Sequence, residues 1–454
     1  MAPAERRRLI GVGLLVLLSR LPWIGHDYGS DPDAYRVVAT ARALLHGEAY
    51  APSRLPGYPG YEFLSVLTAD GPPWASNLVT ALSSVAAFVL LALLLRQLGA
   101  RNYLLLACGF AMVPVVYISS CCTMDYLPSM TLSFSAAFAL FRGRAAVAGM
   151  LLGLAISCRM TAGAMVLPLG VWLWLSLPWR EALRASLTFG AIALGVAALF
   201  FLPVWRIYGA GFFMFYDNDD YPPLDIVLPR ATTLVWGTLG CAALLLIVVL
   251  LPWYRRYSGE QLRCVRKRHM LVVALGTCVL YLAAFVRLPD EAGYLVPLVP
   301  WMLVSLAILA PPLLNSLLAA ALLLSPWLGF DGWRPVLRGP ILEDHAVRES
   351  QDADTRAVIE AVRPLPGRAT VVCGWVLPRL SLELHGNTLG PHQFIYLVDN
   401  EDQYQYYLRA GWQIYYIPGV DAYESQARQI ELAEHGARPL DVPRERQRPA
   451  STGE

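Results

Sequence analysis

Long runs of apolar residues, separated by short polar loops, fill the first 328 positions of the chain. A membrane-spanning helix needs about 20 apolar residues because the hydrocarbon core is about 30 Å thick, and on this criterion the sequence predicts about eleven spans. Their approximate bounds are 8–25, 74–96, 103–120, 125–141, 145–159, 161–178, 185–206, 230–253, 270–287, 294–310 and 312–328. We expect the two short spans between 145 and 178 to form a hairpin that turns at Arg159.

The charged residues of this segment alternate in sign from one loop to the next. The basic loops contain Arg6 to Arg8, Arg96 with Arg101, Arg142 with Arg144, Arg180 with Arg184, and the run 255–268. The loops between them contain Asp27, Asp31 and Asp33, then Asp125, then the run 217–220, and finally Asp290 with Glu291. Because short loops rich in Lys and Arg stay in the cytoplasm, we expect a cytoplasmic N-terminus, with the acidic loops and the C-terminal domain on the periplasmic or extracellular side.

The first acidic loop, 26–73, is long enough to contain structure of its own. Tyr35, Val38 and Leu45 belong to an apolar set that recurs at helical spacing among polar residues. This pattern is typical of an amphipathic helix that lies in the membrane interface. We therefore expect one helix of the loop to lie flat over the bundle.

Beyond residue 329 the sequence becomes polar. Short runs typical of strands, at 369–373, 393–398 and 413–417, alternate with helical patterns at 348–363, 401–411 and 421–435. Such alternation predicts a small α/β domain with a parallel sheet. The expected fold is therefore an all-α membrane bundle over 1–328, a soluble α/β domain over 329–442, and a charged tail over 443–454 whose composition is typical of disorder.

The overall composition supports the membrane interpretation and excludes several classes of protein. Apolar residues make up 56% of the chain and charged residues 15%, whereas a soluble domain has about 25% charged residues. The net charge of +2, from 36 basic and 34 acidic residues, excludes a nucleic-acid partner. The eight cysteines show no C-x-x-C spacing, so we expect neither a zinc site nor a disulfide framework.

Three aspartates in the acidic loops are candidates for acid–base chemistry. A carboxylate beside a lipid surface is partly desolvated, which raises its pKa and suits it to accept a proton from a hydroxyl. Asp31 and Asp33 lie on either side of Pro32, and Asp125 precedes the fourth span. The alternative is helix capping, because Asp before Pro is typical of a helix start and an acidic first turn suits the helix dipole. The sequence leaves both interpretations open.

Arg159 and Arg287 lie inside or beside apolar spans, where a charged group is costly and usually marks a site. The apolar flanks of Arg159 offer no counter-ion within a helical turn, so we expect it to meet an anion from another segment. Arg287 could instead extend its charged end to the interface. Because a guanidinium binds phosphate in a bidentate manner, these arginines would suit a lipid phosphate headgroup.

Several short stretches, which follow one another along nearly the whole chain, together resemble a known family. These stretches are Ser30–Tyr35, Ala41–Gly47 and Ser53–Pro59, then Asp125, Gly149–Gly153 with Arg159, Tyr294–Pro300, Leu365–Val372 and Ala410–Ile417. Together they resemble the bacterial membrane glycosyltransferases of the GT-C fold that use polyprenyl-phosphate-linked sugars, including protein mannosyltransferases and lipid A aminoarabinose transferases. The mannosyltransferases have adjacent Asp and Glu in the first loop, whereas Pro32 separates the two aspartates here.

The resemblance and the residues together imply an inverting sugar transfer at the outer face of the bacterial inner membrane. An acceptor hydroxyl would give its proton to Asp33 or Asp31 and attack the anomeric carbon opposite the lipid phosphate. Arg159, Arg287 or Arg54 would stabilise the departing phosphate. Other candidate substrate contacts are Tyr35, Tyr58, Glu62 and Tyr294.

The expected partners are membrane lipid, a polyprenyl-phosphate sugar as donor, and a protein, lipid or glycan as acceptor. No cofactor or bound metal is required, although Mg²⁺ or Mn²⁺ would be compatible with the carboxylates. The main alternative is a transporter or flippase of a lipid-linked saccharide, since such pathways also use intramembrane charges. Transporters commonly show internal repeats with broken helices, and this chain shows none. A non-catalytic scaffold would not need Arg159.

Overall fold

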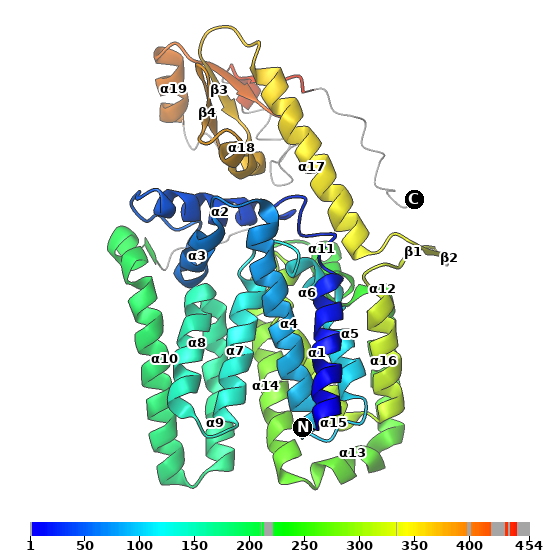
Figure 1. Cartoon of the computed structure of the whole chain (residues 1–454). Helices are drawn as coiled ribbons and strands as arrows, with labels where there is room; N and C mark the ends of the chain where they lie inside the picture. Colours follow the sequence, from blue (N-terminus) through cyan, green and yellow to red (C-terminus); the bar gives the residue numbers. More distant parts are fainter. Residues whose placement is uncertain are drawn as a thin grey trace. The chain divides into compact units, whose positions relative to one another are not determined.

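The computed structural model describes residues 2–209, 211–212, 221–332, 334–396, 401–418, 432–434 and 436–442. Each expected span contains helix (Figure 1). The helices are α1 (Pro3–Leu18), α4 (Pro73–Gln97), α5 (Tyr103–Ala111), α6 (Pro114–Ser119), α7 (Tyr126–Leu140), α8 (Ala145–Cys158), α9 (Val166–Ser176), α10 (Trp179–Tyr208), α12 (Thr233–Leu250), α14 (Val265–Arg287), α15 (Leu298–Leu309) and α16 (Pro312–Leu324).

The expected number of eleven membrane spans is not confirmed. Within the described residues, four helical stretches are both long and apolar enough to cross a membrane: Pro73–Gln97, Trp179–Tyr208, Thr233–Leu262 and Val265–Arg287. The other apolar helices are shorter, partly because proline divides them. Pro114 has no amide proton to continue α5 and instead starts α6.

The chain turns at Arg159, as expected. Arg159 ends α8 with an extended backbone, and the 3₁₀ helix η2 (Met160–Met165) leads from it into α9. Helices α8 and α9 are therefore joined by a short 3₁₀ segment rather than by an ordinary polar loop. Because α7 and α8 are antiparallel neighbours, the start of α7 and the end of α8 lie at the same end of the bundle (Figure 1).

Short helices occupy the segments between the spans. The expected amphipathic helix is α2 (Pro32–Leu45), and it is followed by α3 (Pro59–Ser65) and the 3₁₀ turn η1 (Val66–Thr68). Later connections contain α11 (Leu224–Ala231), η4 (Leu251–Tyr254), α13 (Arg255–Leu262) and η5 (Ala292–Leu295). The acidic run 217–220 lies outside the described residues.

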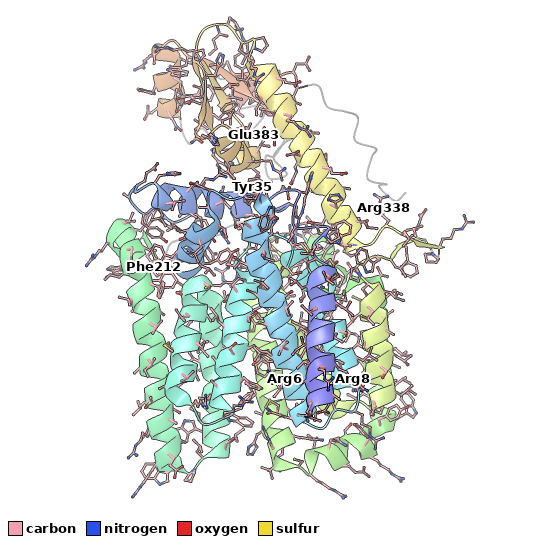
Figure 2. All side chains as sticks on the ribbon, viewed as in Figure 1. Arg6, Arg8, Tyr35, Phe212, Arg338 and Glu383 are labelled. Atoms are coloured by element: carbon pink, nitrogen blue, oxygen red, sulfur yellow. The ribbon has the colours of Figure 1, made fainter. Side chains whose placement is uncertain are left out.

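The basic loops gather at one end of the bundle, as their alternation along the chain predicts. Arg6 and Arg8 lie near the start of α1, at the same end as α13 (Figure 2). An ion pair of 2.9 Å between Glu5 and Arg96 joins this end of α1 to the end of α4. Which end faces the cytoplasm stays a prediction.

The C-terminal residues form the expected α/β unit. Helix α17 (Pro340–Val362) leads into β3 (Ala369–Val372), η6 (Gly374–Val376), α18 (Leu377–Glu383), β4 (Thr388–Leu389), β5 (His392–Ile395), α19 (Glu401–Arg409), β6 (Gln413–Tyr416) and β7 (Arg438–Pro439). The strand order is β4-β5-β3-β6-β7, with β3 parallel to β5 and β6, and β6 parallel to β7. Within the described part of this sheet, β4 alone pairs antiparallel, with β5, and the sequence pattern did not predict it. The expected helix at 421–435 lies mostly outside the described residues.

The structure divides the chain differently from the boundary at 329. One unit contains Met1–Tyr28 and Thr40–His345, and the other contains Gly29–Ala39 with Ala346–Glu454. The antiparallel pair of β1 (Gly329–Asp331) and β2 (Arg334–Val336) therefore belongs to the first unit. The start of α2 belongs to the second unit, where Arg379 Nη2 donates to the carbonyl of Gly29 and Gln351 Nε2 donates to that of Ser30.

Candidate functional site

The counter-ion of Arg159 is Asp125, which precedes α7. Arg159 Nη1 lies 2.7 Å from Asp125 Oδ2, and Arg54 Nη2 lies 2.9 Å from Asp125 Oδ1. The carboxylate is fully buried, and the two guanidiniums are nearly so. Asp125, which lies 34 residues earlier in the chain, is therefore the anion that we expected near Arg159. Asp125 forms no capping hydrogen bond, so the capping alternative does not apply to its side chain.

Three tyrosine rings surround this charged group. The guanidinium carbon of Arg159 lies 4.2 Å from the ring centre of Tyr126, 4.9 Å from that of Tyr294 and 5.7 Å from that of Tyr58. Arg54 lies 3.9 Å from the ring centre of Tyr58. Aromatic faces attract cations, so the rings stabilise the buried charges while shielding them from lipid.

A buried carboxylate fixes the loop that carries Arg54 and Tyr58. Glu62 of α3 is fully buried, and its oxygens accept hydrogen bonds from Tyr50 Oη at 2.5 Å and from Ser53 N at 2.8 Å. Burial, and after it the charge of Glu62, raises the pKa of Tyr50, so Tyr50 remains a donor. Glu62 therefore holds the loop in place, rather than lying exposed as a base.

Close packing of α3 on the end of α8 brings this loop to Arg159. A Cβ atom added to Gly60 would lie 2.1 Å from Ser157 Oγ and 3.0 Å from the Ser157 backbone. Only glycine leaves room for that approach. The site in the first unit thus depends on three elements: the start of α7, the end of α8, and the loop preceding α3.

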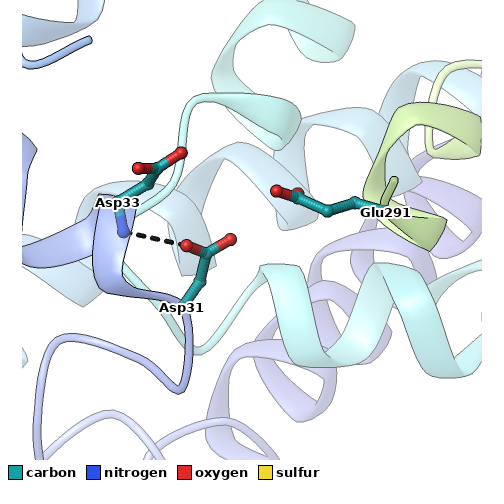
Figure 3. A group of neighbouring side chains, drawn as sticks. All are labelled: Asp31, Asp33 and Glu291. Atoms are coloured by element: carbon teal, nitrogen blue, oxygen red, sulfur yellow. Dashed lines mark hydrogen bonds between the residues drawn. The ribbon is translucent and has the colours of Figure 1, made fainter. Parts of the chain in front are cut away.

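In the second unit, Asp31 caps α2. Asp33 N donates to Asp31 Oδ1 over 2.8 Å at the start of the helix (Figure 3), which is the capping role that the sequence offered as an alternative. Asp33 Oδ1 lies 3.1 Å from Arg36 Nη1. Tyr35 is buried, with the Arg379 guanidinium 4.5 Å from its ring centre. Capping uses one oxygen of Asp31 and does not by itself prevent proton acceptance.

The remaining candidate, Arg287, is exposed at the end of α14 and takes no part in the contacts around Asp125. The sequence analysis missed three participants. The Tyr126 ring lies over Arg159, and its hydroxyl donates a hydrogen bond to Glu291. The side chain of Glu291 is drawn in Figure 3. Tyr281 interacts with Arg159, and its buried hydroxyl has no hydrogen-bond partner among the described residues. Their signal was weak because an aromatic residue in an apolar span usually belongs to the core.

Comparison with solved structures identifies the fold. One similar structure is that of ArnT from Cupriavidus metallidurans bound to undecaprenyl phosphate. The match covers 90% of this chain and 88% of the ArnT chain, with a TM-score of 0.55 and 14% sequence identity. The match to the apo structure of the same protein covers 95% of this chain and 94% of the ArnT chain, with a TM-score of 0.55 and 12% sequence identity. No family model matches the chain, and the search of curated proteins found no match. ArnT is an aminoarabinose transferase of the GT-C family, and the chain therefore has the GT-C-like fold that its sequence resembles.

Proposed function

We propose that this protein is an inverting glycosyltransferase that moves a sugar from a polyprenyl-phosphate donor to an acceptor hydroxyl at the outer face of the bacterial inner membrane. The observation that carries the proposal is the arginine pair, Arg54 and Arg159, which Asp125 holds at the ends of apolar helices. A similar fold is found in an ArnT structure bound to undecaprenyl phosphate. The transferred sugar would be a hexose or a pentose.

The arginine pair would bind the donor phosphate. A guanidinium offers five N–H donors, and among the described residues the Arg159 side chain hydrogen-bonds only to Asp125, through Nη1. The hydroxyl of Tyr281 adds a further donor without a described partner. As the glycosidic bond breaks, negative charge grows on the phosphate, and preorganised donors stabilise it without reorganisation. Asp125 would act as a positioning residue because both of its oxygens already accept from arginine.

The base is proposed from the sequence. Asp33 or Asp31 would accept the proton of the acceptor hydroxyl as its oxygen attacks the anomeric carbon opposite the phosphate, which leaves as polyprenyl phosphate. The bond to the new oxygen forms as the bond to phosphate oxygen breaks, so the configuration inverts. No cofactor or metal is needed for this step.

The test is a transfer assay with the purified chain in liposomes that contain polyprenyl-phosphate sugars. Labelled sugar should pass to one of the candidate protein, lipid or glycan acceptors, and Asp33→Asn or Asp31→Asn should abolish most of the transfer. EDTA in a parallel reaction should leave the rate unchanged. Full turnover by both variants would remove these aspartates from the mechanism. If the wild-type chain transferred sugar to none of the acceptors, the proposed glycosyltransferase activity would be contradicted.

A further inference from the structure

A polar cavity of about 380 Å³ lies at the basic end of the bundle. Its lining residues are Leu98, Gly99, Ala100, Arg101, Asn102, Tyr257, Gln261, Lys267, Ala307, Pro312 and Asn315. They come from the loop after α4, from α13, and from the adjacent ends of α14, α15 and α16. We call this the basic-end cavity. It is distinct from the Asp125 site, because Lys267 and Tyr281 are 14 residues apart in α14, which corresponds to about 21 Å along the helix.

The charge of the basic-end cavity is positive. Arg101 and Lys267 line it from two different segments, and no Asp or Glu is among its lining residues. Lys267 is half-buried, and its Nζ donates to Gln261 Oε1. An ammonium has three donors, so this hydrogen bond leaves Lys267 able to bind a further acceptor. A phosphate group, with its negative charge and acceptor oxygens, complements both cations.

The cavity wall is fixed by hydrogen bonds that satisfy nearby carbonyls. Asn102 Nδ2 donates to the carbonyl of Pro312, and the buried Asn315 donates through Nδ2 to the carbonyls of Leu306 and Ala310. These carbonyls, at the turn between α15 and α16, would otherwise attract Arg101 and Lys267. Because they are already paired, the two cations remain available to an external anion.

The position of the cavity favours a lipid ligand. It lies where the long apolar helices α4 and α14 meet polar loops, the level at which lipid phosphates lie in a bilayer. Basic pockets between membrane helices bind the headgroups of anionic lipids. We propose that the basic-end cavity binds a phosphate group, from either an anionic phospholipid headgroup or a soluble phosphate compound.

The sequence offers a direct probe, because Lys267 is the only lysine in the chain. The full chain is placed in phosphatidylcholine vesicles, with or without phosphatidylglycerol, and treated with a limiting amount of an amine-reactive ester. Peptide mass spectrometry then measures the labelled fraction of Lys267. A third sample contains phosphatidylcholine vesicles and soluble glycerol phosphate. A ligand present at about ten times its Kd should slow labelling about tenfold, as expected for one-site protection.

Two arginine variants separate binding in the cavity from the general effect of surface charge. Arg101→Gln should lose the protection, whereas Arg263→Gln, which removes an equal charge from an exposed position outside the lining, should keep it. Native mass spectrometry of the wild-type chain and Lys267→Gln provides a second measurement, in which the variant should retain less phosphatidylglycerol. This measurement remains informative if Arg101→Gln fails to fold.

Protection by phosphatidylglycerol alone would identify a lipid headgroup as the ligand, and protection by glycerol phosphate would identify a soluble phosphate compound. Unchanged labelling in both samples would overturn the proposal. Equal protection of the wild-type chain and both arginine variants would also overturn it, since the effect would then arise from the charged surface. None of these outcomes depends on sugar transfer.

Discussion

At the scale of single residues, the Asp125 site contains charges that stabilise one another in a buried environment. Two arginines and one aspartate leave a single positive charge, and three tyrosine faces lie around it. Removing one partner of such a group leaves another buried charge uncompensated, which costs more than the pair contributes in stability. Mutation of one of these three residues is therefore expected to destabilise the fold by leaving a buried charge uncompensated, and not only by removing one favourable contact.

Asp125→Asn should lower the free energy of unfolding by about 3–5 kcal/mol, because both guanidiniums lose their buried counter-ion. Thermal unfolding of the purified protein in detergent would measure the loss. Glu343→Gln is the control, since Glu343 forms an exposed ion pair with Arg338, which should contribute at most about 1 kcal/mol. Equal stability of the two variants would contradict the proposed role of Asp125.

Glu62→Gln should weaken donor binding while the protein remains folded. The amide can accept a hydrogen bond through only one of its two end atoms, so Tyr50 or the Ser53 loop loses an acceptor. A lost hydrogen bond to a charged group costs about 1.5–3 kcal/mol, which corresponds to about 10- to 100-fold in affinity. Titration with polyprenyl phosphate measures the change, and an unchanged Kd would show that the loop does not depend on Glu62.

At the scale of elements, two glycines allow α8 and α10 to pack closely. A Cβ atom on Gly149 would lie 2.6 Å from the carbonyl oxygen of Phe189, and one on Gly153 would lie 2.6 Å from Val196 Cβ. Such small residues four positions apart allow membrane helices to approach each other. Because α8 ends at Arg159, this packing also determines where the guanidinium lies.

Gly153→Val should separate α8 from α10 and cost about 1–3 kcal/mol through overpacking. The melting temperature and the affinity for polyprenyl phosphate should both fall, since Arg159 moves with α8. Gly195→Ala in α10 is the control, because nothing lies within 4 Å of an added Cβ there. A Gly153→Val variant as stable as Gly195→Ala would contradict the close packing.

At the scale of the whole molecule, the charge pattern predicts which end of the bundle faces the cytoplasm. Cys264 is exposed between α13 and α14, at the basic end. A membrane-impermeant maleimide should therefore label it in inverted vesicles but not in intact spheroplasts. With Cys264 replaced by serine, Glu48→Cys in the exposed loop after α2 should give the opposite result. Labelling of Cys264 in intact spheroplasts would reverse the expected orientation.

The sequence predicted the helical bundle and the α/β unit because both depend on local periodicity. It missed the break before Pro114, although the missing amide proton of proline is a local signal for such a break. It also missed the earlier start of α17, since helix ends depend partly on tertiary packing. The pairing of Asp125 with Arg159 was within reach, because these residues lie at the matching ends of an antiparallel helix pair. The tyrosine rings were not, since their positions depend on contacts among segments far apart in sequence.

In the proposed mechanism, Arg54 and Arg159 hold the phosphate of a polyprenyl-phosphate sugar during transfer. The most direct measurement compares the release of polyprenyl phosphate from that donor by the wild-type chain and by Arg159→Ala, in the presence of acceptor. Arg159→Ala should lose on the order of 3 kcal/mol of transition-state stabilisation, or about a hundredfold in rate. Release at the wild-type rate by Arg159→Ala would contradict it.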